Sequence, residues 1–169
     1  MELRVLVKKM LILTFALLVS ACGYHLRGPL QLPAGLKNVY LEGGSGQLRE
    51  QFVRAMDISS VPMASSPETA GMIVKISGED SERRVLSLGA GGAANDFELG
   101  YRFDFELVGA NNQLLMAREP VEIKREYYND QLAVIAQGNE ELVIRNEMYQ
   151  QAVRTIVNRA RMLLGAKPK

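Results

Sequence analysis

The sequence is poor in the side chains from which most catalytic and metal sites are built. Its 169 residues include one cysteine and one histidine, Cys22 and His25. A single cysteine excludes an intrachain disulfide. One histidine and one cysteine also leave no metal-binding cluster and no Ser-His-Asp or Cys-His arrangement. We therefore expect no enzyme, no metal site and no cofactor.

A nucleotide-binding loop is also missing. Gly89-x-Gly91-x-x-Ala94 has glycine spacing that suits a pyrophosphate site, but such a site needs a helix to begin at the glycines. Here a pattern of alternating apolar residues begins instead, and no Gly-Lys-Ser/Thr follows. We interpret Gly89 to Asn95 as the tip of a hairpin.

No apolar run in the sequence is long enough to cross a bilayer comfortably. The longest candidate, Met10 to Val19, is interrupted only by Thr14, whereas a spanning helix takes about 20 apolar residues. Arg4, Lys8 and Lys9 precede it, and small residues follow. This order is typical of a secretory signal peptide.

The signal ends in Val19-Ser20-Ala21-Cys22-Gly23, which is similar to the bacterial lipobox. The resemblance implies cleavage before Cys22 and lipidation of its thiol, and the several acyl chains make release from the membrane negligible. By resemblance to the sorting rule, aspartate after the cysteine retains a lipoprotein in the inner membrane. Gly23 therefore predicts an anchor in the outer membrane, on its periplasmic side. The alternative is an ordinary signal peptide with a buried cysteine just downstream.

Cleavage before Cys22 changes the net charge and the length of the mature chain. Loss of residues 1–21 removes three bases and one acid, so the net charge changes from +1 to about −1. This value argues against a nucleic-acid partner. We expect a signal peptide at 1–21, a lipidated tether at 22–36, one domain at 37–165 and a tail at 166–169.

The first half of the domain predicts a strand, a helix and a long strand. Lys37 to Glu42 is a strand candidate, and Ser45 can cap a helix through Ile58. Its apolar face contains Leu48, Phe52 and Ala55 or Met56, with Ile58 as a further candidate. Ser59 to Gly71 is rich in proline and serine and predicts a loop. Met72 to Leu88 begins with alternating apolar residues and becomes strongly polar, which indicates a strand whose far end leaves the core in a projecting hairpin.

The second half predicts two more strands. Phe97, Leu99, Tyr101, Phe103, Phe105 and Leu107 alternate with polar residues, which predicts a strand with one face in the core and one in water. After a turn at Gly109 to Asn112, Leu114 to Tyr128 returns as an antiparallel strand. Pro120 inside it indicates an edge position or a bulge.

A long helix completes the fold. Asn139 is a candidate cap, and Gly165 and Pro168 end the pattern. Asp130 to Gln137 can form an earlier helical turn, with Gly138 arguing against a continuous helix. The predicted inward stripe contains Leu142, Tyr149, Val153, Ile156, Ala160 and Leu163. The elements predict an α+β fold, β-α-β-β-β-α, with two helices on one face of a four-stranded, mainly antiparallel sheet.

Two pairs of basic residues are candidates for binding phosphate. Arg83-Arg84 and Lys124-Arg125 are neighbours in the predicted strands, and arginine clamps phosphate through paired hydrogen bonds. Lipopolysaccharide is the abundant phosphorylated partner available to such a lipoprotein. The alternative is that these charges only solvate the surface.

Two motifs resemble a known family. Cys22-Gly23-Tyr24-His25-Leu26-Arg27 looks like the start of the LPS-assembly lipoproteins (LptE), and Asn146-Glu147-Met148-Tyr149 is similar to that family's Glu-Met-Tyr region. The resemblance implies a non-enzymatic subunit that plugs the outer-membrane β-barrel LptD, assists its assembly and binds lipopolysaccharide. Gly89, Gly91 and Gly92 at the hairpin tip are then candidates for contact with the barrel.

The resemblance does not extend to the family's basic residues. The positions that correspond to those residues are Ser87 and Gln137, and neither is basic. Either Arg83-Arg84 and Lys124-Arg125 take over binding, or the chain binds lipopolysaccharide weakly and acts mainly as a plug. A different class also remains open, a free periplasmic lipoprotein that carries an apolar ligand between its helices and its sheet.

Overall fold

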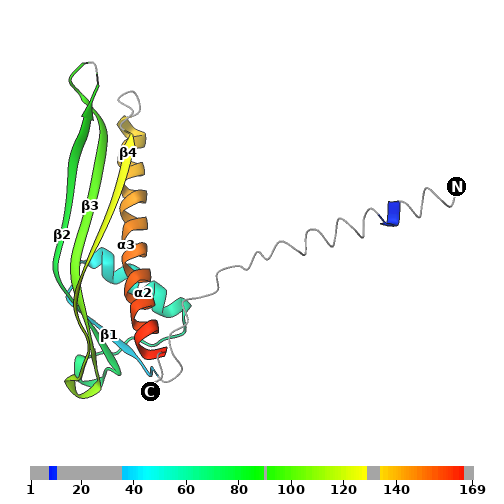
Figure 1. Cartoon of the computed structure of the whole chain (residues 1–169), viewed down its shortest axis with the longest axis vertical. Helices are drawn as coiled ribbons and strands as arrows, with labels where there is room; N and C mark the ends of the chain where they lie inside the picture. Colours follow the sequence, from blue (N-terminus) through cyan, green and yellow to red (C-terminus); the bar gives the residue numbers. More distant parts are fainter. Residues whose placement is uncertain (1–7, 11–35, 90, 129–133, 166–169) are drawn as a thin grey trace.

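The computed structural model describes residues 8–10, 36–89, 91–128 and 134–165. The predicted lipobox with Cys22, most of the predicted signal peptide and the predicted tail lie outside these ranges. The fold is α+β, in the predicted order, with two helices on one face of a four-stranded sheet (Figure 1). Its main elements are β1 (Val39–Glu42), α2 (Gly46–Ile58), β2 (Met72–Leu88), β3 (Ala94–Gly109), β4 (Leu114–Tyr128) and α3 (Val134–Gly165).

The sheet has the order β1-β2-β3-β4. Short β1 pairs in parallel with the first residues of β2, and α2 provides the crossover that parallel strands need. The other two pairings are antiparallel. Pro120 lies in β4, which is an edge strand, the kind of strand in which proline is tolerated. No helix in the described ranges is long and apolar enough to span a membrane.

Helix α2 begins where the sequence predicts. The Ser45 hydroxyl accepts a hydrogen bond from the Leu48 N–H at 3.3 Å, which satisfies one free donor at the helix start. Leu48, Phe52 and Met56 are buried against the sheet. Including Ile58 on this face was wrong: it is 69% exposed, because the helix ends there and its last residue points away from the core.

Helix α3 is longer than predicted. It begins at Val134 and continues through Gly138 and Asn139, so the predicted cap at Asn139 was wrong and the interruption at Gly138 does not occur. Tertiary packing along the sheet outweighs the cost of about 1 kcal/mol for one helical glycine. Leu142, placed on the inward stripe, is 60% exposed. The buried stripe consists of Met148, Ala152, Val153, Ile156, Val157 and Ala160.

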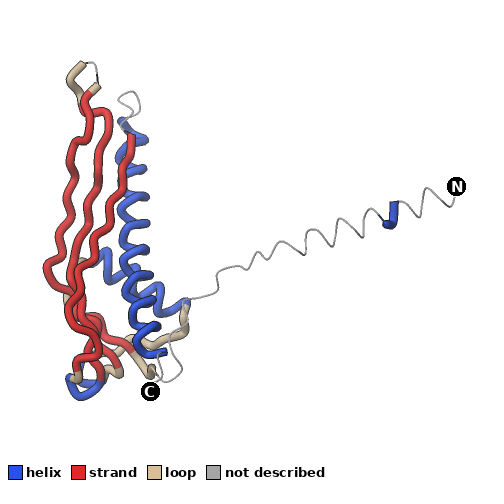
Figure 2. Tube along the Cα trace, viewed as in Figure 1, coloured by secondary structure: helices blue, strands red, loops and turns tan. Residues whose placement is uncertain are grey.

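The core lies between the helices and one face of the sheet. Phe103 and Phe105, predicted to face it, are both buried. α2 covers only the half of the sheet near β1, whereas α3 runs along the length of the three long strands (Figure 2). We call the other end of the sheet, with the β2–β3 turn, the distal end.

The strand β2 leaves the apolar core at a bulge. Its register with β3 shifts between Ser77 and Asp80, and Gly78 has a φ of +62°. The Glu79 carboxylate accepts hydrogen bonds from the Ser45 hydroxyl and from the Tyr101 hydroxyl, each at 2.7 Å. Burial, followed by this contact with Glu79, raises the pKa of Tyr101. The bulge therefore joins the start of α2 to the middle of the sheet.

Beyond the bulge, β2 and β3 form the predicted long hairpin. It does not project freely, because α3 runs along one of its faces (Figure 1). Strand β3 begins at Ala94, so the connecting tip is shorter than predicted. The Gly89 N–H donates to the Ala93 carbonyl at 2.8 Å, and the Gly92 N–H donates to the Gly89 carbonyl at 2.9 Å. These two backbone bonds close the tip on itself.

Candidate functional site

The sheet separates each pair of candidate cations. Successive side chains of a strand point to opposite faces, and the register places Arg83, Leu99 and Arg125 in one row across β2, β3 and β4. Leu99 is fully buried on the helix side. Arg83 and Arg125 therefore lie on the side covered by α3, and Arg84 and Lys124 lie on the open side. Neither neighbouring pair can act as one clamp.

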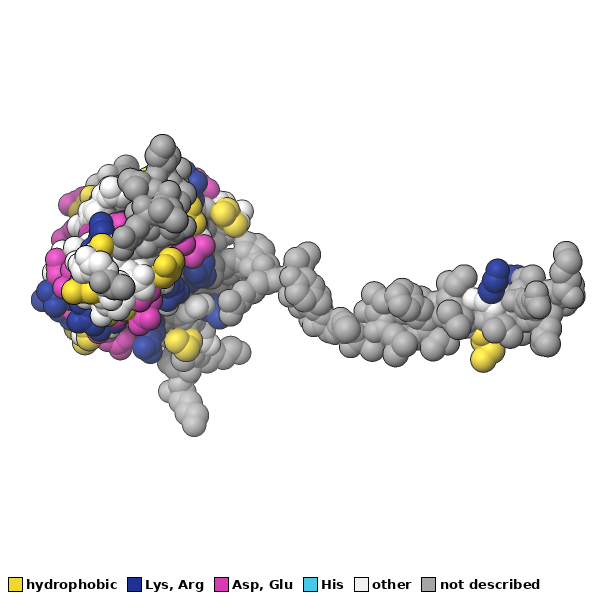
Figure 3. All heavy atoms as spheres, turned by 90° about the horizontal axis from the view of Figure 1, so that it is seen from above, with side chains coloured by type: hydrophobic (Ala, Val, Ile, Leu, Met, Phe, Trp, Pro, Cys, Tyr) yellow, Lys and Arg dark blue, Asp and Glu magenta, His cyan; other side chains and the backbone are white. Residues whose placement is uncertain are grey.

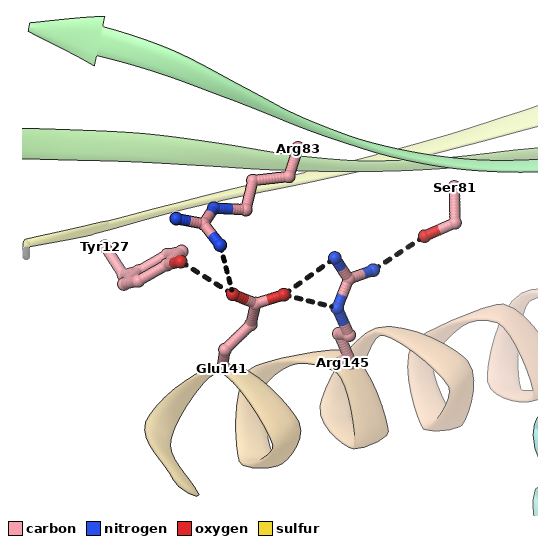
Figure 4. Close-up of polar contacts among 5 residues, drawn as sticks. All are labelled: Ser81, Arg83, Tyr127, Glu141 and Arg145. Carbon is pink, nitrogen blue, oxygen red and sulfur yellow. Dashed lines mark hydrogen bonds and ion pairs between the residues drawn. The ribbon is translucent and has the colours of Figure 1, made fainter. Parts of the chain in front are cut away.

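On the helix side, Glu141 of α3 is the centre of a polar cluster (Figure 4). The Tyr127 hydroxyl and the Arg145 Nε each donate to its carboxylate at 2.8 Å, and Arg83 Nη1 lies 3.4 Å from Glu141 Oε2. Arg145 Nη1 also donates to the Ser81 hydroxyl at 2.7 Å. The cluster ties the first half of α3 to both β2 and β4.

The environment of Glu141 favours its charged form. Burial acts to raise the pKa of this carboxyl, but hydrogen bonds from Tyr127 and Arg145, with the charges of Arg145 and Arg83, outweigh it and hold the pKa below its ordinary value of 4.5. Burial first, and then the hydrogen bond to Glu141, raises the pKa of Tyr127. Glu141 is therefore an anion and Tyr127 a neutral donor at neutral pH.

In this cluster the arginines outnumber their partner carboxylates. The Arg83 guanidinium lies 3.8 Å from the centre of the Phe97 ring, a cation–π contact that keeps it on the sheet. Arg125 donates to the Gln151 side chain, which is neutral. Among the described residues, Arg83, Arg125 and Arg145 have one partner carboxylate, Glu141. Such an arrangement can attract a phosphorylated ligand.

On the open side, the other two candidates each have an acidic partner. Arg84 Nη2 lies 2.8 Å from Glu98 Oε1, and Lys124 Nζ lies 2.7 Å from Glu122 Oε1. The hydrogen bond and then the charge of Glu122 raise the pKa of Lys124. Their charge is largely balanced locally, so Arg84 and Lys124 are weaker candidates for phosphate than Arg83 and Arg125.

The distal end also exposes apolar side chains. Figure 3 views the molecule from this end, and hydrophobic side chains lie among charged ones there. Several large apolar residues at the end of β2, the end of β4 and the start of α3 are 42–66% exposed. They are Val85, Leu86, Leu88, Tyr128, Leu142 and Val143. Exposed apolar residues next to arginines suit a ligand with both apolar and anionic parts.

Some site residues lay beyond sequence reasoning. Arg145 was missed, although its position four residues after Glu141 is the spacing of helical ion pairs and could have indicated it. Ser87 donates to the Asp96 carboxylate on the open side.

Cys22, His25 and the side chain of Gln137 lie outside the described residues. In the described part of the chain, no three histidine, cysteine or acidic side chains are placed to hold a metal ion.

Solved structures define the class to which this fold belongs. Lipoprotein B from Nitrosomonas europaea matches with a TM-score of 0.69 and 24% identity, over 85% of this chain and 94% of that one. Rare lipoprotein B from Shewanella oneidensis matches with a TM-score of 0.60 and 20% identity, over 72% and 91% of the two chains. At these identities the likeness concerns the fold, which is that of small α+β bacterial lipoproteins.

The family follows from the sequence comparisons. The LptE family model, described as lipopolysaccharide-assembly, matches residues 36–160, and the chain belongs to this family. LPS-assembly lipoprotein LptE of Yersinia enterocolitica is 26% identical over 95% of this chain and 78% of its own length. LPS-assembly lipoprotein LptE of Pectobacterium atrosepticum is 27% identical over 93% and 86%. Membership gives the chain the role of an envelope lipoprotein in lipopolysaccharide assembly.

Proposed function

We propose that the chain is a non-enzymatic subunit of the lipopolysaccharide export machinery, anchored to the periplasmic side of the outer membrane by acylated Cys22. In this role it plugs an LptD-type β-barrel, assists assembly of the barrel and binds lipopolysaccharide. The match of residues 36–160 to the lipopolysaccharide-assembly family carries the proposal. The relatives' names speak only of assembly, so the barrel and the direct binding are the parts to be tested.

The helix side of the distal end supports direct binding. Lipopolysaccharide joins phosphate groups to acyl chains. Arg83, Arg125 and Arg145 lie on the helix side of the distal half, and exposed Val85 shares that side, since it is in register with buried Phe97. Tyr128, opposite Asp96, faces the open side. Arg83 and Arg125 are two strands apart in one row, which separates their Cα atoms by about 10 Å. A phosphorylated headgroup can therefore meet more than one guanidinium.

The runner-up function is a carrier of an apolar ligand, which would need a pocket inside the core. The gap between the helices and the sheet has no room even for a water molecule, whereas ligand pockets usually enclose about 300–1,000 Å³. Its walls are tightly packed core residues: Val39, Phe52, Met56, Met72, Val74, Ile156, Val157 and Ala160. An acyl chain would have to displace this core.

Pull-down from detergent-solubilised outer membrane tests the barrel partner. A stoichiometric large barrel supports the proposal, and a monomer with bound lipid supports the runner-up. Direct binding is tested with purified lipopolysaccharide and the Arg125→Gln variant, because Arg125 makes no ion pair with any described residue and its side-chain partner is the neutral Gln151. We expect binding to weaken about 5- to 10-fold. Arg54→Gln, on the outside of α2, is the control.

A further inference from the structure

The face of the sheet that no helix covers carries more acid than base. Strand alternation and register place nine carboxylates and five cations on this open face, counting Arg118 at the irregular part of β4. The acids are Glu42, Asp80, Glu82, Asp96, Glu98, Asp104, Glu106, Glu122 and Glu126. The bases are Lys75, Arg84, Arg102, Arg118 and Lys124.

Three of these cations form ion pairs with acids of the same face. Besides the pairs of Arg84 and Lys124, Arg102 Nη2 lies 2.8 Å from Asp80 Oδ2. In the described ranges, no ion pair involves Glu82, Asp104 or Glu126. Glu42, Asp96 and Glu106 make none either, so on this face the described residues leave six acids without an ion pair against two such cations, Lys75 and Arg118. We refer to Glu82, Asp104 and Glu126, in the three long strands, as the surplus acids.

Two of the surplus acids lie against neighbours on the sheet. Glu126 stands directly opposite Glu98 in the register, and Glu98 is only 7% exposed. A Cβ at Gly100 would lie 3.0 Å from Glu82 Cγ, so the glycine makes room for Glu82 to lie across the strand. Like charges opposite one another cost stability within a single chain. They favour association when a second surface supplies the missing cations.

We propose that this open face contacts the barrel partner, and that the part of the barrel's inner wall against it presents arginine and lysine side chains. The inference rests on the proposed function, because it takes the barrel as the partner. The two faces of the sheet then have separate tasks. The open face repels phosphate and pairs with a basic wall, and the helix side, with its excess of arginine, is left for lipopolysaccharide.

The test compares two triple variants of the full chain, each co-expressed with the barrel. The first, Glu82→Gln/Asp104→Asn/Glu126→Gln, neutralises the surplus acids and breaks no ion pair. The matched control neutralises three exposed acids of the helices that make no ion pair in the described ranges, Asp57→Asn/Glu140→Gln/Glu147→Gln. Both change the net charge equally, and thermal unfolding of each free protein checks that it folds. Should the first triple variant fail to fold, Glu126→Gln alone takes its place.

We expect the open-face variant to bind the barrel about tenfold more weakly at low salt, and the control to bind as wild type does. The difference should vanish near 1 M NaCl, where charges are screened within about 3 Å. Lipopolysaccharide binding should not weaken in either variant. Equal barrel binding by the open-face variant and wild type overturns the inference and leaves the proposed function intact. Failure of wild type to bind any barrel overturns the proposed function, and the inference with it.

Discussion

Replacing Glu141 by glutamine tests the polar cluster that fastens α3 to the distal half of the sheet. The change keeps the shape of the side chain and removes its charge, which leaves Arg83 and Arg145 near one another without a carboxylate. Hydrogen bonds to charged groups contribute about 1.5–3 kcal/mol each, and those between neutral groups about 0.5–1.5 kcal/mol. The side chain of Glu141 is 20% exposed, and water partly replaces what is lost. We expect a total loss of about 2 kcal/mol.

Urea unfolding and thermal unfolding of the unlipidated chain measure this loss. For a protein of this size, about 2 kcal/mol corresponds to a decrease in Tm of about 4–8 °C. Glu140→Gln is the matched control, since Glu140 is the exposed neighbour of Glu141 on the same helix, and it should change stability by less than about 0.5 kcal/mol. In the double variant with Arg145→Gln, the two losses should not add, because both remove the same contact.

The pH dependence provides the sharper test. The folded protein holds the pKa of Glu141 below 4.5, so the charge stabilises the fold above that pH. The contribution disappears as pH falls through the folded pKa, because a protonated glutamate resembles glutamine. The difference between wild type and Glu141→Gln should therefore be full at pH 7 and shrink steadily below about pH 4.5. A difference of the same size at about pH 3, or none at pH 7, would refute the assignment of the charge.

Further predictions concern the anchor, the core and the tip. Cys22→Ala should give an uncleaved or released chain without acyl groups, and mass spectrometry that finds wild-type amounts of the mature acylated protein would contradict the lipobox assignment. Phe103→Ala should lose about 3–5 kcal/mol in a denaturant titration and Arg102→Ala under about 1 kcal/mol, so equal losses would mean that the faces are wrongly assigned. Gly91→Asp should impair barrel co-purification without changing the Tm of the free domain, because nothing lies within 4 Å of a Cβ there. Gly92 is the poorer test site, since its φ of +79° strains any other residue.

The sequence by itself determined the order of elements and most of their faces. Alternation from Phe97 to Leu107 and helical spacing from Leu48 to Met56 are local patterns that report which side of an element is apolar, and both were confirmed. The family resemblance was confirmed over residues 36–160. The lipobox is a motif read by enzymes from a few consecutive residues, so it needed no fold to be predicted.

Tertiary structure decided how the charged residues are grouped. Arg83 and Arg84 are neighbours in sequence, yet the pleat of β2 sends them to opposite faces, and strand pairing brings Arg83 into line with Arg125, 42 positions away. The tertiary fold also carried α3 through Gly138 and Asn139, where local propensity predicts a boundary. Side-chain groups are set by register and by packing between distant segments. The distances between side chains of different strands and of α3 cannot be inferred from consecutive residues. The site was therefore recognisable only in the tertiary structure.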